Sequence, residues 1–172
     1  GEPVNKRNTD SEGLAALTSD KYYISFESNH RIMFHRSLES AGSIIEKHPD
    51  FQNFEFNKGI EAIAINVSGE LFAIPEKPPR QENRYPLYRY MNKKWDIVTN
   101  FPADGPFLVT DADFLSDNSL IVLERDHNWA TGFRTRIRRI SFVNDKVTKI
   151  DILLETKASS ANNEGLSIWY NS

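Results

Sequence analysis

The chain has 172 residues, of which 39% are hydrophobic and 26% charged, with a net charge of −3 and a pI near 5.8. This composition is typical of one soluble globular domain and argues against general binding to nucleic acid or anionic membranes. The absence of cysteine excludes disulfide scaffolds, thiolate zinc sites and cysteine nucleophiles. No apolar run approaches the roughly 18 residues of a membrane span, and no signal peptide is visible.

An internal repeat of about 50 residues organises the sequence. Four segments each carry an acidic residue followed by a short apolar run, and their marker acids are Glu12, Glu61, Asp111 and Glu164. The first three segments continue with a polar turn and then an apolar stretch that ends in glutamate, at residues 22–27, 71–76 and 120–124. Two apolar stretches around a tight turn predict a β-hairpin at the start of each repeat.

Two further strands are predicted after each hairpin. The third strands are expected at residues 31–35, 86–90 and 135–140, and weaker fourth strands at 43–45, 95–98 and 149–153. Residues 38–47 also fit a short helix that Pro49 would end. Four strands in a period of roughly 40–50 residues are typical of a propeller blade, and the agreement of three repeats disfavours the alternative, a β-sandwich with coincidental spacing.

The sequence therefore predicts an all-β fold, a β-propeller with four-stranded antiparallel blades. We expect residues 1–172 to form a single partial propeller domain, with blades at about 10–57, 58–107 and 108–159 and the start of the next blade at 160–172. Because propellers close with roughly 4–8 blades, we expect these three blades and one strand to belong to a larger, six-bladed protein.

The hairpins also predict where the acids meet. Residues equidistant from a tight turn lie opposite each other in an antiparallel pair. Two-residue turns at 19–20, 68–69 and 117–118 would bring three pairs face to face: Glu12 with Glu27, Glu61 with Glu76, and Asp111 with Glu124. Because the first strand of each blade lines the central channel, these pairs and Glu164 would form an acidic ring at one channel mouth.

Such a ring needs an offsetting interaction, because two carboxylates about 5 Å apart repel by about 3 kcal/mol at an effective dielectric of about 20. A divalent cation is one option, since carboxylate oxygens are the ligands that Ca²⁺ or Mg²⁺ prefers. Arginine is a second option, and a raised pKa that keeps one acid protonated is a third. Each glutamate can instead accept backbone N–H or arginine bonds that only hold the sheets together.

Basic residues gather near the third hairpin. Strand alternation would place Arg134, Arg136 and Arg138 on one face, and Arg125 directly follows Glu124. The sequence contains no Gly-x-Ser-x-Gly elbow, phosphate-binding glycine loop, His-Glu-x-x-His zinc helix or EF-hand loop. We accordingly expect no organic cofactor.

Several segments resemble the phytase-like family of β-propellers, named for an esterase-like activity of phytase. Residues 59–64 and 69–76 are similar to its Gly-hydrophobic-Glu-Gly core and the strand that follows, although Ala62 stands where glycine is usual and Pro75 interrupts the strand. Residues 118–126, with Arg134 and Arg136, are similar to its Leu-Glu-Arg segment, and residues 163–166 to its closing Asn-x-Glu-Gly-Leu. The resemblance extends from about residue 10 to the end.

The resemblance implies a phosphoester hydrolase whose recurring acids carry the chemistry, in a family often exported by bacteria. We expect catalysis by Glu61, Glu76, Asp111 and Glu124. Substrate phosphate would be bound by Arg125, Arg134 or Arg136. Ca²⁺ or another divalent cation would be held by Glu12, Glu27, Glu61, Glu76 and Glu164. The expected partner is a small phosphoester or another ligand in the channel, with no nucleic acid, and the expected location is periplasmic or secreted. The alternative is a non-catalytic propeller that binds a cation, a ligand or a partner protein.

Overall fold

The computed structural model describes residues 10–27, 29–55, 58–79 and 82–169. Three antiparallel sheets of four strands each make up this part of the chain, and the strands of each sheet follow one another in sequence order. The ends of the predicted domain, residues 1–9 and 170–172, lie outside the described residues. The predicted all-β fold is confirmed.

Each sheet takes its four strands from a separate stretch of the chain. The first sheet consists of β1 (Ser11–Ala16), β2 (Tyr22–Phe26), β3 (Arg31–His35) and β4 (Ser43–Ile44). The second consists of β5 (Ile60–Ile65), β6 (Leu71–Pro75), β7 (Arg84–Met91) and β8 (Lys94–Pro102). The third consists of β9 (Leu108–Phe114), β10 (Leu120–Asn128), β11 (Gly132–Val143) and β12 (Lys146–Glu155).

The predicted helix at residues 38–47 is wrong, because this stretch contains the short strand β4 instead. A 3₁₀ helix, Pro49–Asn53, follows it. Pro49 occupies the first turn of that helix, where the missing N–H of proline costs nothing, and the ring of His48 accepts a hydrogen bond from the Asp50 amide. The proline that was expected to end a helix begins one.

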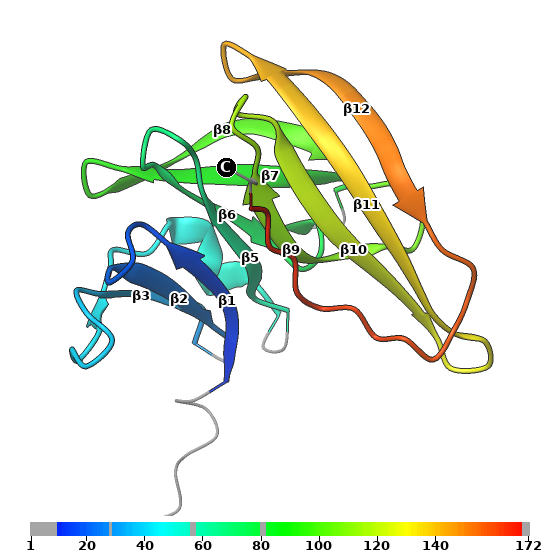
Figure 1. Cartoon of the computed structure of the whole chain (residues 1–172), viewed down its shortest axis with the longest axis horizontal. Coiled ribbons are helices and arrows are strands. Elements are labelled where there is room, and N and C mark those ends of the chain that lie inside the picture. The colour runs from blue at the N-terminus through cyan, green and yellow to red at the C-terminus, as the bar shows by residue number, and fades with distance from the viewer. Residues whose placement is uncertain (1–9, 28, 56–57, 80–81, 170–172) are drawn as a thin grey trace, which may run out of the picture.

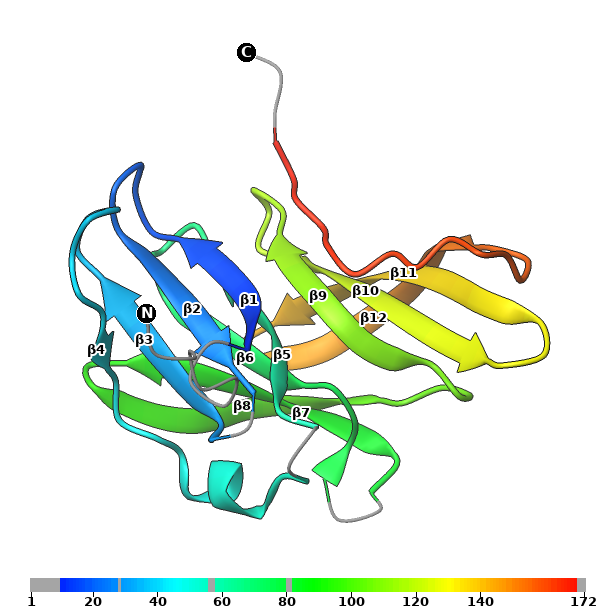
Figure 2. The same cartoon turned by 90° about the horizontal axis from the view of Figure 1, so that it is seen from below.

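The first strands of the three sheets, β1, β5 and β9, lie side by side at the centre of the array (Figures 1 and 2). Gly13 permits part of this close approach, since a Cβ atom at that position would lie only 2.7 Å from the carbonyl oxygen of Glu61. The outer strands β4, β8 and β12 lie at the far edges of their sheets. This radial order, with first strands innermost, is the arrangement of propeller blades.

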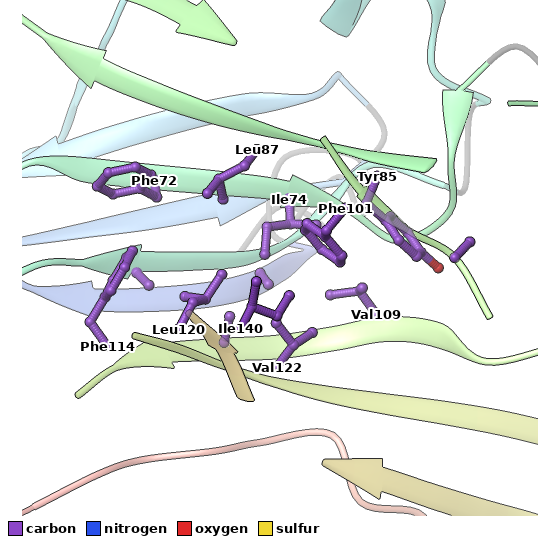
Figure 3. Close-up of a cluster of buried hydrophobic side chains, with 14 residues drawn as sticks. Phe72, Ile74, Tyr85, Leu87, Phe101, Val109, Phe114, Leu120, Val122 and Ile140 are labelled. Carbon is purple, nitrogen blue, oxygen red and sulfur yellow. The ribbon is translucent and has the colours of Figure 1, made fainter. Parts of the chain in front are cut away.

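Two hydrophobic clusters fill the spaces between neighbouring sheets. Between the second and third sheets, Tyr85, Phe101 and Leu120 are completely buried (Figure 3). Between the first and second sheets, Phe51 and Tyr88 pack edge to face with ring centroids 5.2 Å apart. Burial of each large apolar side chain contributes about 1.5–3 kcal/mol, so these two clusters hold the three sheets together face to face.

The segment after β12 returns to the centre and runs beside β9 in both views (Figures 1 and 2). The amides of Leu166 and Ile168 donate hydrogen bonds to the carboxylates of Asp111 and Asp113, at 2.6 and 2.9 Å. The segment therefore occupies the place of the next first strand around the axis. Three blades followed by this segment form a partial β-propeller.

Candidate functional site

A β-bulge interrupts the pairing of the first hairpin in every sheet. The extra residues lie between Ser11 and Leu14 in β1, between Ile60 and Ala62 in β5, and between Val109 and Asp111 in β9. Bulges bend a strand and redirect the bulged side chain. The three structurally equivalent bulge residues are Glu12, Glu61 and Thr110.

The predicted face-to-face pairing of the acids is wrong. The amide of Glu27 bonds to the carbonyl of Asp10, and the amide of Glu76 bonds to the carbonyl of Gly59. In the third sheet, the residue opposite Glu124 is Val109. Each of these partners lies two positions before the predicted one.

The pairing is thus shifted by two positions from the predicted register. Loop length accounts for one of these positions and the bulge for the other. The second hairpin closes with an Asn66 N to Glu70 O bond, which leaves a three-residue loop, and Gly69 adopts a left-handed φ of 79° at its third position. The third hairpin does the same, with Asn118 at a φ of 62°. A three-residue loop ending in a left-handed residue is a common hairpin connection. The bulge adds the second position.

Most of the predicted acids nevertheless converge on one pocket, which we call the acidic pocket. It has a volume of about 320 Å³ and lies where the inner strands begin. Its lining consists of Ser11, Glu12, Glu27, Glu61, Glu76, Thr110, Arg125 and Glu164. Two blades and the C-terminal segment therefore contribute carboxylates, while the third blade contributes a hydroxyl group and a guanidinium group.

Burial and mutual repulsion raise the pKa of two of these acids. The pKa of Glu61 rises to about 8, first because the carboxyl is desolvated and then because Glu12, Glu76 and Glu27 repel its charge. The pKa of Glu12 rises to about 7 through desolvation, followed by repulsion from Glu27 and Asp10. Glu12 remains exposed whereas Glu61 is partly buried, so Glu61 provides the stronger evidence for a perturbed site.

Two cationic side chains pair with acids of this pocket. Lys58 Nζ lies 2.6 Å from Glu76 Oε2, and Arg125 binds the carboxylate of Glu164 and the side-chain oxygen of Asn162. Among the described residues, no ion pair reaches Glu12 or Glu61. The negative charge on the inner strands thus exceeds the positive charge available to offset it.

A set of donor atoms suited to a hard cation lies at the first blade. One carboxylate oxygen each from Asp10, Glu12 and Glu27 can be chosen so that all three lie within 4.8 Å of one another. Ca²⁺ binds oxygen ligands at roughly 2.3–2.6 Å, so oxygens at this spacing can share one ion. Sequence reasoning did not select Asp10, which directly precedes β1 and joins this set of donor atoms.

Glu124 lies away from the pocket and is fully buried. Its carboxylate accepts hydrogen bonds from Arg136 Nε, at 2.8 Å, and from Arg138. Arg136 also donates hydrogen bonds to the side-chain carboxylate and the backbone carbonyl of Asp104, at 3.0 and 2.8 Å. The structure therefore places the expected catalytic Glu124 and the expected phosphate-binding Arg136 in a buried network that joins the third sheet to the segment after β8.

Asp111 and Arg134 also lie outside the pocket lining. Asp111 accepts amide bonds from Leu166 and Ala112, and desolvation raises its pKa to about 6. Arg134 forms a two-pronged contact with Asp126, at 2.9 and 2.7 Å. These contacts stabilise the third blade and its junction with the C-terminal segment.

Fold and site together define a segment of a β-propeller with an acid-rich pocket beside its inner strands. The sequence matches the model of the phytase-like family, described as "Esterase-like activity of phytase", over residues 1–168. The chain belongs to this family.

One of two similar solved structures supports the fold. A structure described as "YCF48 bound to D1 peptide" aligns with a TM-score of 0.52 and 12% identity, covering 84% of this chain and 40% of that chain. A protein of unknown function from Bacteroides caccae aligns with a TM-score of 0.47 and 15% identity, covering 81% and 41%. The chain thus spans about two fifths of the length of these structures. No curated protein matches the sequence. Within the described residues, no helix is long and apolar enough to cross a membrane.

Proposed function

We propose that the chain belongs to a phosphoester hydrolase that acts at the acidic pocket with the help of a divalent cation. The family description names an esterase-like activity of phytase. The observation that carries the proposal is the convergence of five glutamates on one pocket, two of them with raised pKa values and without an ion pair among the described residues.

Asp10, Glu12 and Glu27 would hold the cation, because their carboxylate oxygens already lie close enough to share one. A bound Ca²⁺ or similar ion would neutralise phosphate charge and lower the pKa of a coordinated water. Arg125, 22% exposed on its side chain, would orient a phosphate oxygen after exchanging its present partner, Glu164. The pocket would then hold its cation at the first blade and its anion-binding group at the third.

Glu61 is the candidate general acid. A carboxyl with a pKa of about 8 carries its proton at neutral pH and can donate it to the leaving oxygen of a phosphoester. Glu76 would position the site indirectly, because its side chain pairs with Lys58 while its backbone carbonyl accepts a hydrogen bond from Val109, at 2.9 Å.

Hydrolysis assays test this function. The protein would be incubated with p-nitrophenyl phosphate and bis(p-nitrophenyl) phosphate in the presence of Ca²⁺, Mg²⁺, Mn²⁺ or EDTA. We expect turnover that EDTA abolishes and that the Glu12→Gln, Glu27→Gln double variant lacks. Glu155→Gln, a surface change outside the pocket, should retain it. Absence of turnover with every metal would contradict the proposal.

A second candidate is a propeller that binds a cation without catalysis. The observation in its favour is that the guanidinium of Arg125 already pairs with Glu164. Because this cationic group is then not available to bind phosphate, the pocket suits cations rather than phosphate. Calorimetric Ca²⁺ binding without hydrolysis of either substrate would support this candidate. The family's frequent export fits either function and underlies our proposal of a periplasmic or secreted location.

A further inference from the structure

A second cavity, of about 360 Å³, lies between the second and third sheets at the loop ends of their hairpins. We call it the loop cavity. Its rim comes from the β5–β6, β9–β10 and β11–β12 loops, and its floor comes from apolar side chains of the strands. The acidic pocket lies at the opposite, open ends of the first hairpins, so the two sites share no lining residue.

Aromatic rings form part of the floor. Phe72 and Phe114 lie at one end of the core between the two sheets (Figure 3), with ring centroids 4.9 Å apart and planes tilted by 56°. An alkyl chain gains favourable contact on such rings, and a cation within about 6 Å of a ring centroid is attracted to the ring face. The floor therefore suits a side chain that is apolar along its length and positive at its tip.

The rim carries an excess of negative charge. Glu70, Asp117 and Asp145 line the cavity, and the described part of its lining includes no lysine or arginine. The side chains of Asp117 and Asp145 are 55% and 57% exposed, so both are accessible from solvent.

Two arginines behind the rim compensate only part of this charge. Arg139 pairs with Asp117, while Arg89 lies 3.0 Å from Asp96, 3.4 Å from Asp145 and 3.7 Å from Glu70. The four carboxylates of this group exceed its two guanidinium groups by two negative charges.

We propose that the loop cavity binds an arginine or lysine side chain presented by a polypeptide partner. The stem would lie on Phe72 and Phe114, and the charged head would meet Asp117 and Asp145. The cavity volume of about 360 Å³ is at the lower end of the roughly 300–1,000 Å³ of ligand pockets and is large enough to admit a long side chain. Because the rim consists of surface loops, the partner's backbone would remain outside.

The test is an NMR titration of the ¹⁵N-labelled chain with three probes: the peptide Ac-Gly-Arg-Gly-NH₂, the same peptide with norleucine in place of arginine, and free agmatine. We expect the arginine peptide to shift the backbone amides of Asn66, Asn118 and Asn144, which lie in the three loops. The Asp117→Asn, Asp145→Asn double variant should weaken this binding by about five- to tenfold. Glu155→Gln should leave it unchanged.

Each result decides the proposal. Equal binding of the norleucine peptide would show that charge does not contribute to binding. Binding of agmatine alone would exclude a polypeptide partner. Shifts confined to other surfaces, or no shift in the unmodified protein, would overturn the assignment without depending on any variant. Loss of arginine-peptide affinity at high salt, together with retained loop shifts at low salt, would support it.

Discussion

Replacement of Glu61 by glutamine probes the electrostatic strain of the acidic pocket. Glutamine keeps the shape of the side chain but has no charge to desolvate or repel. We therefore expect Glu61→Gln to stabilise the metal-free protein above neutral pH and to flatten the dependence of its stability on pH.

The size of the effect follows from the pKa of Glu61, which rises from 4.5 to about 8 on folding. Because the folded state favours the protonated carboxyl, this group contributes stability in full below about pH 4.5 and loses that contribution as the pH rises toward 8. One pKa unit corresponds to about 1.4 kcal/mol. Between about pH 5 and about pH 7.5, ionisation of Glu61 in the unfolded chain should lower the unfolding free energy by about 3 kcal/mol, a loss that the glutamine variant would not show.

Urea unfolding in EDTA at a series of pH values measures this difference. Glu155→Gln removes one surface carboxylate outside the pocket, so its pH profile should run parallel to that of the unmodified protein. If the Glu61→Gln profile were parallel as well, the carboxyl would ionise as freely as in water, and the reasoning about the pocket would fail. Addition of Ca²⁺ should flatten the profile of the unmodified protein, because a bound cation stabilises the ionised carboxylates.

Three other changes test separate parts of the structure. Glu124→Gln should destabilise the protein by about 3–5 kcal/mol in urea unfolding, because it leaves buried Arg138 without a counter-charge and Arg136 with Asp104 alone; a loss below about 1 kcal/mol would contradict this. Tyr85→Phe should cost about 1 kcal/mol, since its hydroxyl bonds the carbonyls of two connecting segments, and an unchanged thermal midpoint would refute that role. The Glu12→Gln, Glu27→Gln double variant should bind Ca²⁺ at least about tenfold more weakly by calorimetry, and unchanged affinity would place the cation elsewhere.

Local patterns were sufficient to predict the strands, because each repeat contains the pattern of a β-hairpin: an apolar stretch, a polar turn and a second apolar stretch. The strands β2, β6 and β10 begin where the sequence predicted, and β10 extends four residues further, to Asn128. Residues 38–47 were ambiguous because short apolar spacing fits both a helix and an edge strand. Packing of Ile45 against the core between the first and second sheets favours the extended form.

The register of strand pairing was harder to predict, because a difference of one residue in the length of the loop changes it. Gly69 and Asn118 are residues that tolerate a left-handed φ, and their position at the end of each loop was the available signal for a three-residue turn. The β-bulges carried no such signal in the sequence, since they form where strands of neighbouring blades meet.

The sequence by itself determined a repeated acidic first hairpin and therefore a crowd of carboxylates beside the inner strands. Only the tertiary structure decided which residues of the third blade join them. By hairpin register, Arg125 rather than Glu124 is the third-blade equivalent of Glu27 and Glu76. Glu124, one position earlier, therefore lies in the core with its arginines, while Thr110 and Arg125 line the pocket. In a β-strand one residue separates one face from the other, so sequence spacing alone could not assign these side chains to their sites.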